Sequence, residues 1–80
     1  MIRVTIRFYA DLKERYSPGQ EEGVVPLDLE EGSRVSEVFK ELNIDDREIG
    51  FLLRDDEKVQ KDAELRDGDL IHFFSFAAGG

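Results

Sequence analysis

The two glycines at the end of the sequence, Gly79 and Gly80, are the residues whose type and position are best suited to chemistry. They follow Ala77 and Ala78, so we expect a narrow, flexible tail that ends in a carboxylate. Such a carboxylate is ionised at neutral pH and can attack the α-phosphate of ATP, forming an acyl-adenylate that a sulfur nucleophile can open. Residues without side chains thread easily into a narrow catalytic tunnel. The alternative interpretation is a frayed terminus that happens to be small and glycine-rich.

The segment that leads into this tail alternates between two faces and is predicted to be a strand from Leu70 to about Phe76. Ile71 and Phe73 share the core parity. The residues of the opposite parity are His72, Phe74 and Phe76. We expect Phe74 and Phe76 to be exposed beside the tail, the alternative being that one of them packs under the loop at 20–23. His72 is the only histidine in a chain without cysteine, so we expect a surface residue and no metal ligand.

A second alternating segment at 2–8 predicts another half-buried strand, with Ile2, Val4, Ile6 and Phe8 facing the core. If the first and last strands are neighbours, Arg3, Arg7 and Tyr9 share the open face with Phe74. From the third strand we place Leu52 and Arg54 there. Aromatic and arginine side chains are enriched at protein interfaces. The predicted partner-binding residues are therefore Phe74, Phe76, Arg7, Arg54, Leu52 and His72.

The elements that position these residues are read from apolar spacing and turn signals. A short helix is predicted at 10–16, and an edge strand follows at 25–29, because Pro26 cannot donate a ladder hydrogen bond. The main helix has apolar residues at 35, 38, 39 and 42, with Ser33 as its expected cap and an end near Asn43. A third strand at 49–54 turns at 55–57, and Val59 begins a short return strand. The order of helices and strands predicts the α+β class.

Length and composition exclude several classes of protein. With 80 residues the chain is one domain, and its lack of cysteine excludes a disulfide framework and a thiolate site. No apolar run approaches a membrane span, so we expect no membrane partner and a cytoplasmic location. The net charge of −8 disfavours nucleic acid, whose phosphates are bound by Lys and Arg.

Motifs of self-contained catalysis are missing from the sequence. It has no phosphate-binding glycine loop, no Ser/His/Asp set and no paired-carboxylate pocket. The acidic runs at 55–57 and 67–69 lack the alternating ligands of a calcium loop and are interpreted as turns. We expect a substrate or a subunit, with no cofactor bound by this chain, and not an enzyme.

Three stretches together resemble the ubiquitin-like sulfur-carrier family that includes the small subunit of molybdopterin synthase and the thiamine-pathway sulfur carrier. They lie at 4–12 (VTIRFYADL), at 31–35 (EGSRV) and from 65 (LRDGD) through to Gly79 and Gly80. The resemblance implies a ubiquitin-like β-grasp fold: a mixed sheet of four to five strands with one main helix packed on one face. It divides the chain into a domain at 1–76 and a flexible tail at 77–80.

The same resemblance implies a function. An ATP-dependent E1-like adenylyltransferase would adenylate Gly80, using ATP itself, and a sulfurtransferase would convert the adenylate into a thiocarboxylate. The large subunit of molybdopterin synthase would then draw sulfur from it, because the helix at 10–16 and the long loop after it resemble the molybdopterin type. The alternatives are a thiamine-type carrier and a ubiquitin-like modifier conjugated through Gly80. The chain departs from the family at Phe74-Ser75-Phe76-Ala77, where a proline-rich stretch is common.

Overall fold

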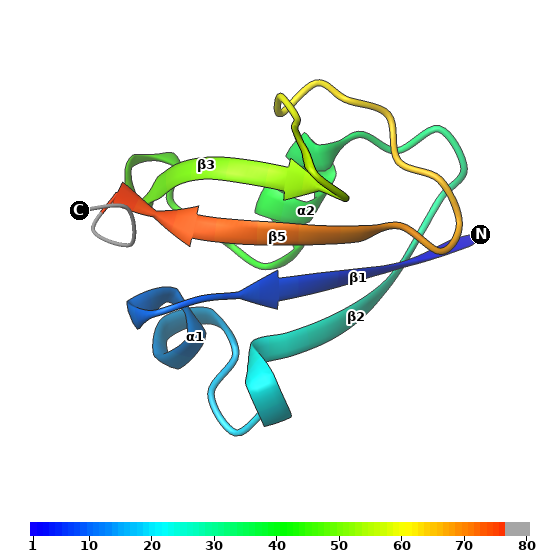
Figure 1. The fold of residues 1–80 in the computed structure, drawn as a ribbon. Helices are drawn as coiled ribbons and strands as arrows, with labels where there is room; N and C mark the ends of the chain where they lie inside the picture. Colours follow the sequence, from blue (N-terminus) through cyan, green and yellow to red (C-terminus); the bar gives the residue numbers. More distant parts are fainter. Residues whose placement is uncertain (77–80) are drawn as a thin grey trace.

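The computed structural model describes residues 1–76, and Figure 1 shows how their helices and strands are arranged. The strands are β1 (Ile2–Phe8), β2 (Val24–Leu29), β3 (Ile49–Arg54), β4 (Glu57–Lys58) and β5 (Leu70–Ser75). The α-helices are α1 (Asp11–Tyr16) and α2 (Val35–Glu41), and two short 3-10 helices are η1 (Glu21–Gly23) and η2 (Asp46–Glu48). Among the described residues, no helix is long and apolar enough to cross a membrane.

Across residues 1–76, five strands form one mixed sheet in the order β2-β1-β5-β3-β4. β1 and β5 run parallel inside the sheet, with Ile6 beside Ile71 and Phe8 beside Phe73. The other neighbouring strands are antiparallel. β2 lies at the edge, as Pro26 predicts, because an edge strand needs no hydrogen bond from that position. The predicted α+β class and β-grasp fold are confirmed.

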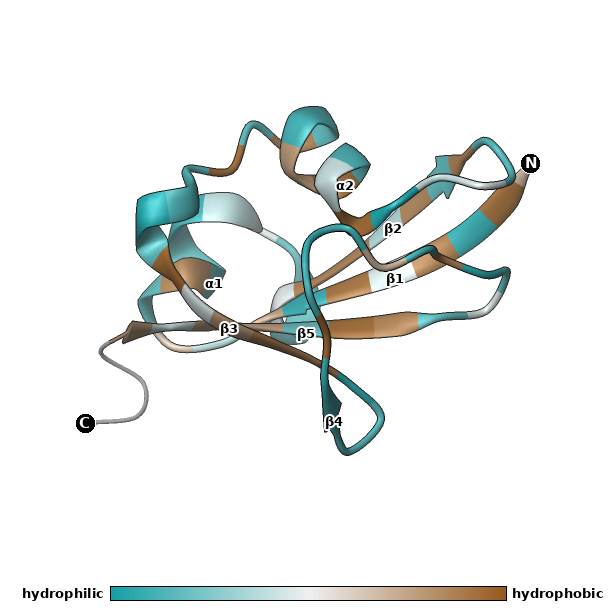
Figure 2. Cartoon of the chain, turned by 90° about the horizontal axis from the view of Figure 1, so that it is seen from above, coloured by the Kyte–Doolittle hydropathy of each residue, from teal (hydrophilic) through white to brown (hydrophobic). Residues whose placement is uncertain are grey.

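The core lies between the sheet and α2, which covers one face of the sheet (Figure 2). The alternation predicted for β1 is confirmed, since its four apolar side chains at even positions are buried. From α2, Val35 and Val38 are fully buried, and the Phe39 ring packs 5.4 Å from the Phe73 ring. Among residues 1–76, no helix covers the other face of the sheet.

The start of α2 differs from the prediction that Ser33 caps the helix. Arg34 occupies the N-cap position, and no side chain bonds the first amides. Instead, the Val35 amide donates to the Ala63 carbonyl at 3.0 Å, and the Ser36 amide donates to the Lys61 carbonyl at 2.9 Å. The long loop before β5 thus satisfies the amides that a capping hydroxyl would otherwise bond. The predicted end near Asn43 is confirmed, because Asn43 has a φ of 54° just past the helix.

The phase of β3 is the main departure from the expected placement of side chains. Ile49 and Leu52 both face the core, three positions apart, because a register irregularity lies between Ile49 and Phe51. Leu52 is 4% exposed and stands opposite Phe73, so its predicted place on the open face is wrong. Phe51 takes that place.

Arg54 is misplaced by the same shift. It stands opposite Ile71, whose side chain is fully buried, so it belongs to the helix side of the sheet. Its guanidinium pairs with the Asp69 carboxylate at 3.2 Å and donates to the Glu64 carbonyl at 3.0 Å. Arg54 therefore ties β3 to the loop before β5. The short return strand is β4, which ends just before Val59.

The chain enters α1 through a strained turn. Ala10 has a φ of 54° and a ψ of −135°, and the Leu12 amide donates to the Tyr9 carbonyl at 3.2 Å. These angles belong to the first central position of a type II′ turn, where glycine is preferred. The turn begins at Tyr9, at the margin of the uncovered face.

Candidate functional site

The face of the sheet opposite α2, called the open face below, holds most of the predicted partner-binding residues. It is where alternate residues of neighbouring strands meet without a covering helix. By register it carries Arg3, Thr5, Arg7 and Tyr9 on and just after β1; Val24, Pro26 and Asp28 on β2; Phe51 and Leu53 on β3; Lys58 on β4; and Leu70, His72 and Phe74 on β5.

Three of these side chains form an aromatic row: Tyr9, Phe74 and Phe51. The Tyr9 and Phe74 rings stack with centroids 4.5 Å apart and planes 13° apart. The Phe74 and Phe51 rings stack with centroids 4.6 Å apart and planes 11° apart. These spacings match the separation of neighbouring strands, so the row runs across the strands of the sheet. Phe74 is half-buried at its centre.

A cation lies at each end of the aromatic row. The Arg7 guanidinium carbon lies 5.1 Å from the Tyr9 ring centroid, and the Lys58 ammonium lies 5.5 Å from the Phe51 ring centroid. Both distances fall within the range of cation–π attraction. Arg7 is among the partner-binding residues predicted from the sequence, whereas Lys58 and Phe51 are not.

Beside the row, His72 is half-buried and bonded to Tyr9. The Tyr9 hydroxyl lies 2.7 Å from His72 Nδ1, and the two ring centroids are 5.6 Å apart. His72 also neighbours Arg7 on β1 and Leu53 on β3. Within residues 1–76, no three His, Asp or Glu side chains come together as a metal site.

β5 contributes Phe74 to the row and ends at Ser75, one residue before the last described residue. Phe76 is 69% exposed, while Phe74 stacks in the row, so neither ring packs under the loop at 20–23. A Cβ at Gly50 would stand 3.0 Å from the Phe76 amide nitrogen and 3.0 Å from the Ser75 carbonyl carbon. A side chain there would push the two backbones apart by a few tenths of an ångström, because they approach closely at the bulge. Gly79 and Gly80 lie outside the described residues.

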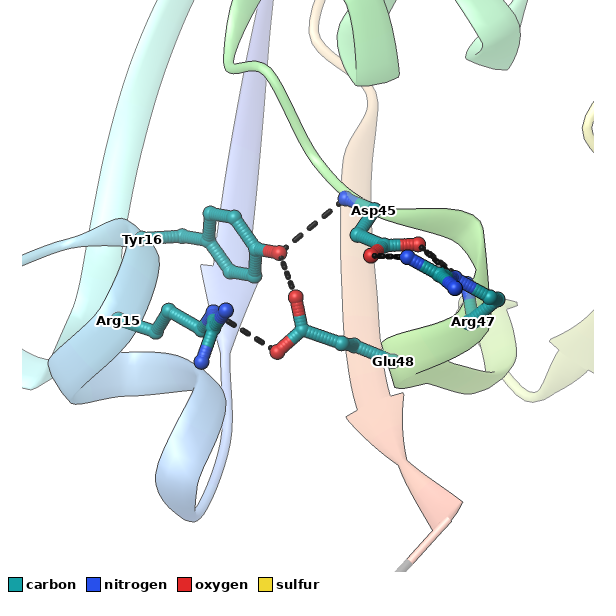
Figure 3. A network of polar contacts seen from close by, with 5 residues as sticks. All are labelled: Arg15, Tyr16, Asp45, Arg47 and Glu48. Atoms are coloured by element: carbon teal, nitrogen blue, oxygen red, sulfur yellow. Dashed lines mark hydrogen bonds and ion pairs between the residues drawn. The ribbon is translucent and has the colours of Figure 1, made fainter.

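A polar network holds α1 against the segment before β3, near the end of β5 (Figure 3). The Tyr16 hydroxyl donates to Glu48 Oε1 and accepts from the Asp45 amide at 3.1 Å. Arg15 pairs with the second oxygen of Glu48 at 2.8 Å, and Arg47 pairs with Asp45 at 2.9 Å. Burial raises the pKa of Tyr16 above its ordinary 10.0, and the hydrogen bond to Glu48 raises this pKa further.

Known proteins similar to this chain agree with the fold described above. The family model described as the ThiS family matches residues 6–80. No curated protein matches the sequence. A Pyrococcus furiosus structure described as a proposed molybdopterin converting factor, subunit 1, has a TM-score of 0.73 at 19% identity, covering 94% of this chain and 98% of that chain.

Two further solved structures come from Haloferax volcanii. SAMP1 has a TM-score of 0.75 at 18% identity, covering 98% of this chain and 99% of its own. The small archaeal modifier protein 1 structure has a TM-score of 0.73 at 16% identity, covering 94% of this chain and 98% of its own. At these identities the structural likeness concerns the fold.

The sheet order, the one-sided core and the uncovered face define a ubiquitin-like β-grasp domain with a half-buried aromatic row on that face. Because the family model covers residues 6–80, the chain belongs to the ThiS family, and the predicted membership of the ubiquitin-like sulfur-carrier proteins is confirmed. Its fold is the one that carriers of this type share with the Haloferax modifier.

Proposed function

We propose that this protein is a sulfur carrier whose reactive group is the carboxylate of Gly80. An ATP-dependent E1-like adenylyltransferase activates it: a carboxylate oxygen bonds to the α-phosphorus of ATP, and pyrophosphate leaves. The outer sulfur of a persulfide on a sulfurtransferase then bonds to the acyl carbon, and AMP leaves with the bonding electrons. A thiol of that partner next attacks the inner persulfide sulfur, so that the S–S bond to the acyl sulfur breaks, the partner is left with a disulfide, and the acyl sulfur keeps the electron pair. The product is a thiocarboxylate at Gly80, and the catalytic side chains belong to the partners.

The observation that carries this proposal is the extent of the family match. It runs from β1 through β5 and includes Gly79 and Gly80. In the proposal, residues 1–76 form the docking domain and residues 77–80 the tail, with Gly79 providing the narrow approach to a partner's active site. Docking of the domain makes sulfur transfer effectively intramolecular, because the tail is held at the site by the bound domain.

Among pathways, we favour molybdopterin synthesis, with the large subunit of molybdopterin synthase as the sulfur acceptor and the cytoplasm as the location. The support is the segment between β1 and β2, which holds the short helix α1 and a long connection to β2, the two features on which the resemblance to the molybdopterin type rests. The structural likeness to the Pyrococcus furiosus protein agrees with this choice. The alternative pathway for a sulfur carrier of this fold is thiamine synthesis.

The open face supplies the docking residues of this proposal. Phe74, Phe76, Arg7 and His72 keep their predicted partner-binding role, and Phe51 joins them from its place in the aromatic row. Leu52 and Arg54 leave the set, because the first is buried and the second is bonded to Asp69.

The first experiment is the intact mass of the protein purified from its own cells under mild conditions. Replacement of one oxygen by sulfur, localised to Gly80 by fragmentation, is the expected result. A Gly80 deletion variant should fold normally by thermal unfolding and lose sulfur transfer. Sulfur transfer that survives loss of both glycines would overturn the proposal.

A ubiquitin-like modifier is the second candidate, favoured by the fold shared with small archaeal modifier protein 1. In that case Gly80 forms an isopeptide bond with target lysines after the same activation. Mass spectrometry of cellular proteins then finds lysines that carry a Gly-Gly remnant. Conjugates found together with an unmodified Gly80 would favour the modifier over the carrier.

A further inference from the structure

Ser75, the last residue of β5, has a buried hydroxyl without a hydrogen-bond partner. The residue is 5% exposed, and its Oγ bonds no other group of residues 1–76. Within that part of the chain it is the one buried side-chain polar atom in this condition. Buried hydroxyls are nearly always bonded in folded proteins, because an unpaired one has lost its bonds to water. The Ser75 hydroxyl therefore needs a partner from beyond the described residues.

The neighbours of Ser75 among the described residues do not supply that partner. Across the strands it stands opposite Ile49, whose side chain is apolar. The polar groups of the network near the end of β5 bond one another: the Tyr16 hydroxyl donates to Glu48, and Arg15 pairs with the second oxygen of Glu48 (Figure 3). The hydroxyl of Ser75 takes no part in this network.

The backbone at Ser75 lies at a change of conformation and is packed closely. The strand ends at Ser75, and Phe76, which follows it, has the conformation of a 3-10 turn. On the β3 side, a Cβ at Gly50 would stand 3.0 Å from the Ser75 carbonyl and 3.0 Å from the Phe76 amide nitrogen. Ser75 is thus held at the residue that precedes a turn, which is the cap position of that turn.

A serine at a cap position accepts a hydrogen bond through its side-chain oxygen. The donor is the backbone amide two or three residues further along the chain. From Ser75 these amides belong to Ala77 and Ala78, which begin the tail and lie outside the described residues. The first amides of a helical turn have no acceptor within the turn. An acceptor without a donor and donors without an acceptor are therefore two or three residues apart.

We propose that Ser75 is a positioning residue for the tail: its Oγ accepts a hydrogen bond from the amide of Ala77 or Ala78 and fixes the direction in which the tail leaves β5. The inference rests on the proposed function for its purpose, which is to present the Gly80 carboxylate to the activating enzyme. Fewer orientations of the tail mean that a larger fraction is aligned for attack on ATP. Gly79 and Gly80 follow the hydrogen bond and stay narrow.

The first test measures the exchange of the Ala77 and Ala78 amide protons with water, by NMR on the isotope-labelled full chain. The variants are Ser75→Ala and Ser75→Thr, which keeps the hydroxyl. Ser33→Ala is the matched control, because it removes a hydroxyl before α2 that does not cap the helix. Thermal unfolding of every protein verifies the fold.

In Ser75→Ala we expect one of the two amides to exchange about fivefold faster, the equivalent of one lost cap. Ser75→Thr and Ser33→Ala should exchange as the wild type does. Unchanged exchange in a folded Ser75→Ala, above all with a raised melting temperature, would show a hydroxyl that is simply unpartnered and would overturn the inference. Wild-type amides that exchange as fast as those of an unfolded peptide would overturn it as well.

The second test is adenylation by the adenylyltransferase of the same organism, read by ATP–pyrophosphate exchange. Ser75→Ala should lower kcat about fivefold and keep KM within about twofold, because the open face is unchanged while the tail is less well aligned. Ser75→Thr should restore kcat. Equal kcat in the wild type and Ser75→Ala, or a rise in KM alone, would overturn the positioning role. A wild-type protein that shows the NMR effect but is not adenylated overturns the proposed function instead.

Discussion

Gly50 on β3 and Ser75 on β5 approach so closely that a Cβ at Gly50 would stand 3.0 Å from both the carbonyl carbon and the carbonyl oxygen of Ser75. This contact lies at the bulge that turns Phe51 onto the open face and returns Leu52 to the core. It also lies where the chain leaves the sheet toward the tail. Because Gly50 has no side chain, the bulge in β3 and the end of β5 can lie this close together.

The variant Gly50→Ala tests this relationship. Its new methyl group meets backbone atoms, which cannot rotate away, so we expect the free energy of unfolding to fall by about 1–2 kcal/mol. Urea unfolding measures the change. Gly19→Ala is the comparison, because a Cβ there meets nothing within 4 Å and its cost comes from the φ of +80° alone. A Gly50→Ala protein as stable as the wild type would show that β3 and β5 can move apart at this point without loss of stability.

Ala10 is the opposite case, a residue with a side chain where glycine is preferred. Its φ of 54° and ψ of −135° are strained for alanine by about 1–3 kcal/mol, and glycine loses about 0.5–1 kcal/mol more to chain entropy. Ala10→Gly should therefore raise the free energy of unfolding by about 1 kcal/mol. Ala10→Val should lower it, since β-branched residues avoid positive φ. Equal melting temperatures for all three proteins would contradict the strained turn.

Tyr16 gives the protein an alkaline pH dependence. Its pKa is raised in the folded state by burial and by the hydrogen bond to Glu48, so the folded protein holds this proton at a pH where the unfolded chain has lost it. The stabilisation is complete below pH 10 and is lost as the pH rises from 10 through the folded pKa. Tyr16→Phe should remove this loss and lower stability at neutral pH by about 1 kcal/mol.

The measurement for Tyr16 is urea unfolding across the alkaline range, together with an ultraviolet titration of the tyrosines. Tyr9 is the only other tyrosine, so Tyr9→Phe isolates the Tyr16 titration and serves as the control. A slope of stability against pH that is unchanged in Tyr16→Phe would assign the effect to another group.

Phe76 separates docking from folding. Its ring is 69% exposed, so Phe76→Ser should change the free energy of unfolding by no more than about 0.5 kcal/mol. If the ring anchors a partner near the tail, the KM of the activating enzyme for this protein should rise. Leu70→Ser is the matched control, because Leu70 is an exposed apolar residue at the other end of β5. A larger effect of Leu70→Ser would move the docking site away from the chain exit.

Much of the fold follows from the sequence because local spacing carries it. The alternation in β1, the edge position of Pro26 and the apolar stripe of α2 each report which face of one element is buried. The open face and the places of Arg7, His72 and Phe74 on it were predictable once β1 and β5 were taken as neighbours.

Tertiary structure decided what depends on contacts between distant segments. The bulge at Gly50 shifted β3 by one residue, which exchanged Leu52 for Phe51, and the isolated glycine was its only signal in the sequence. Carbonyls of the loop at 61–63 bond the start of α2, a contact that no local cap pattern encodes. The aromatic row with its two cations exists because three strands set its members side by side, at distances that only the assembled sheet determines.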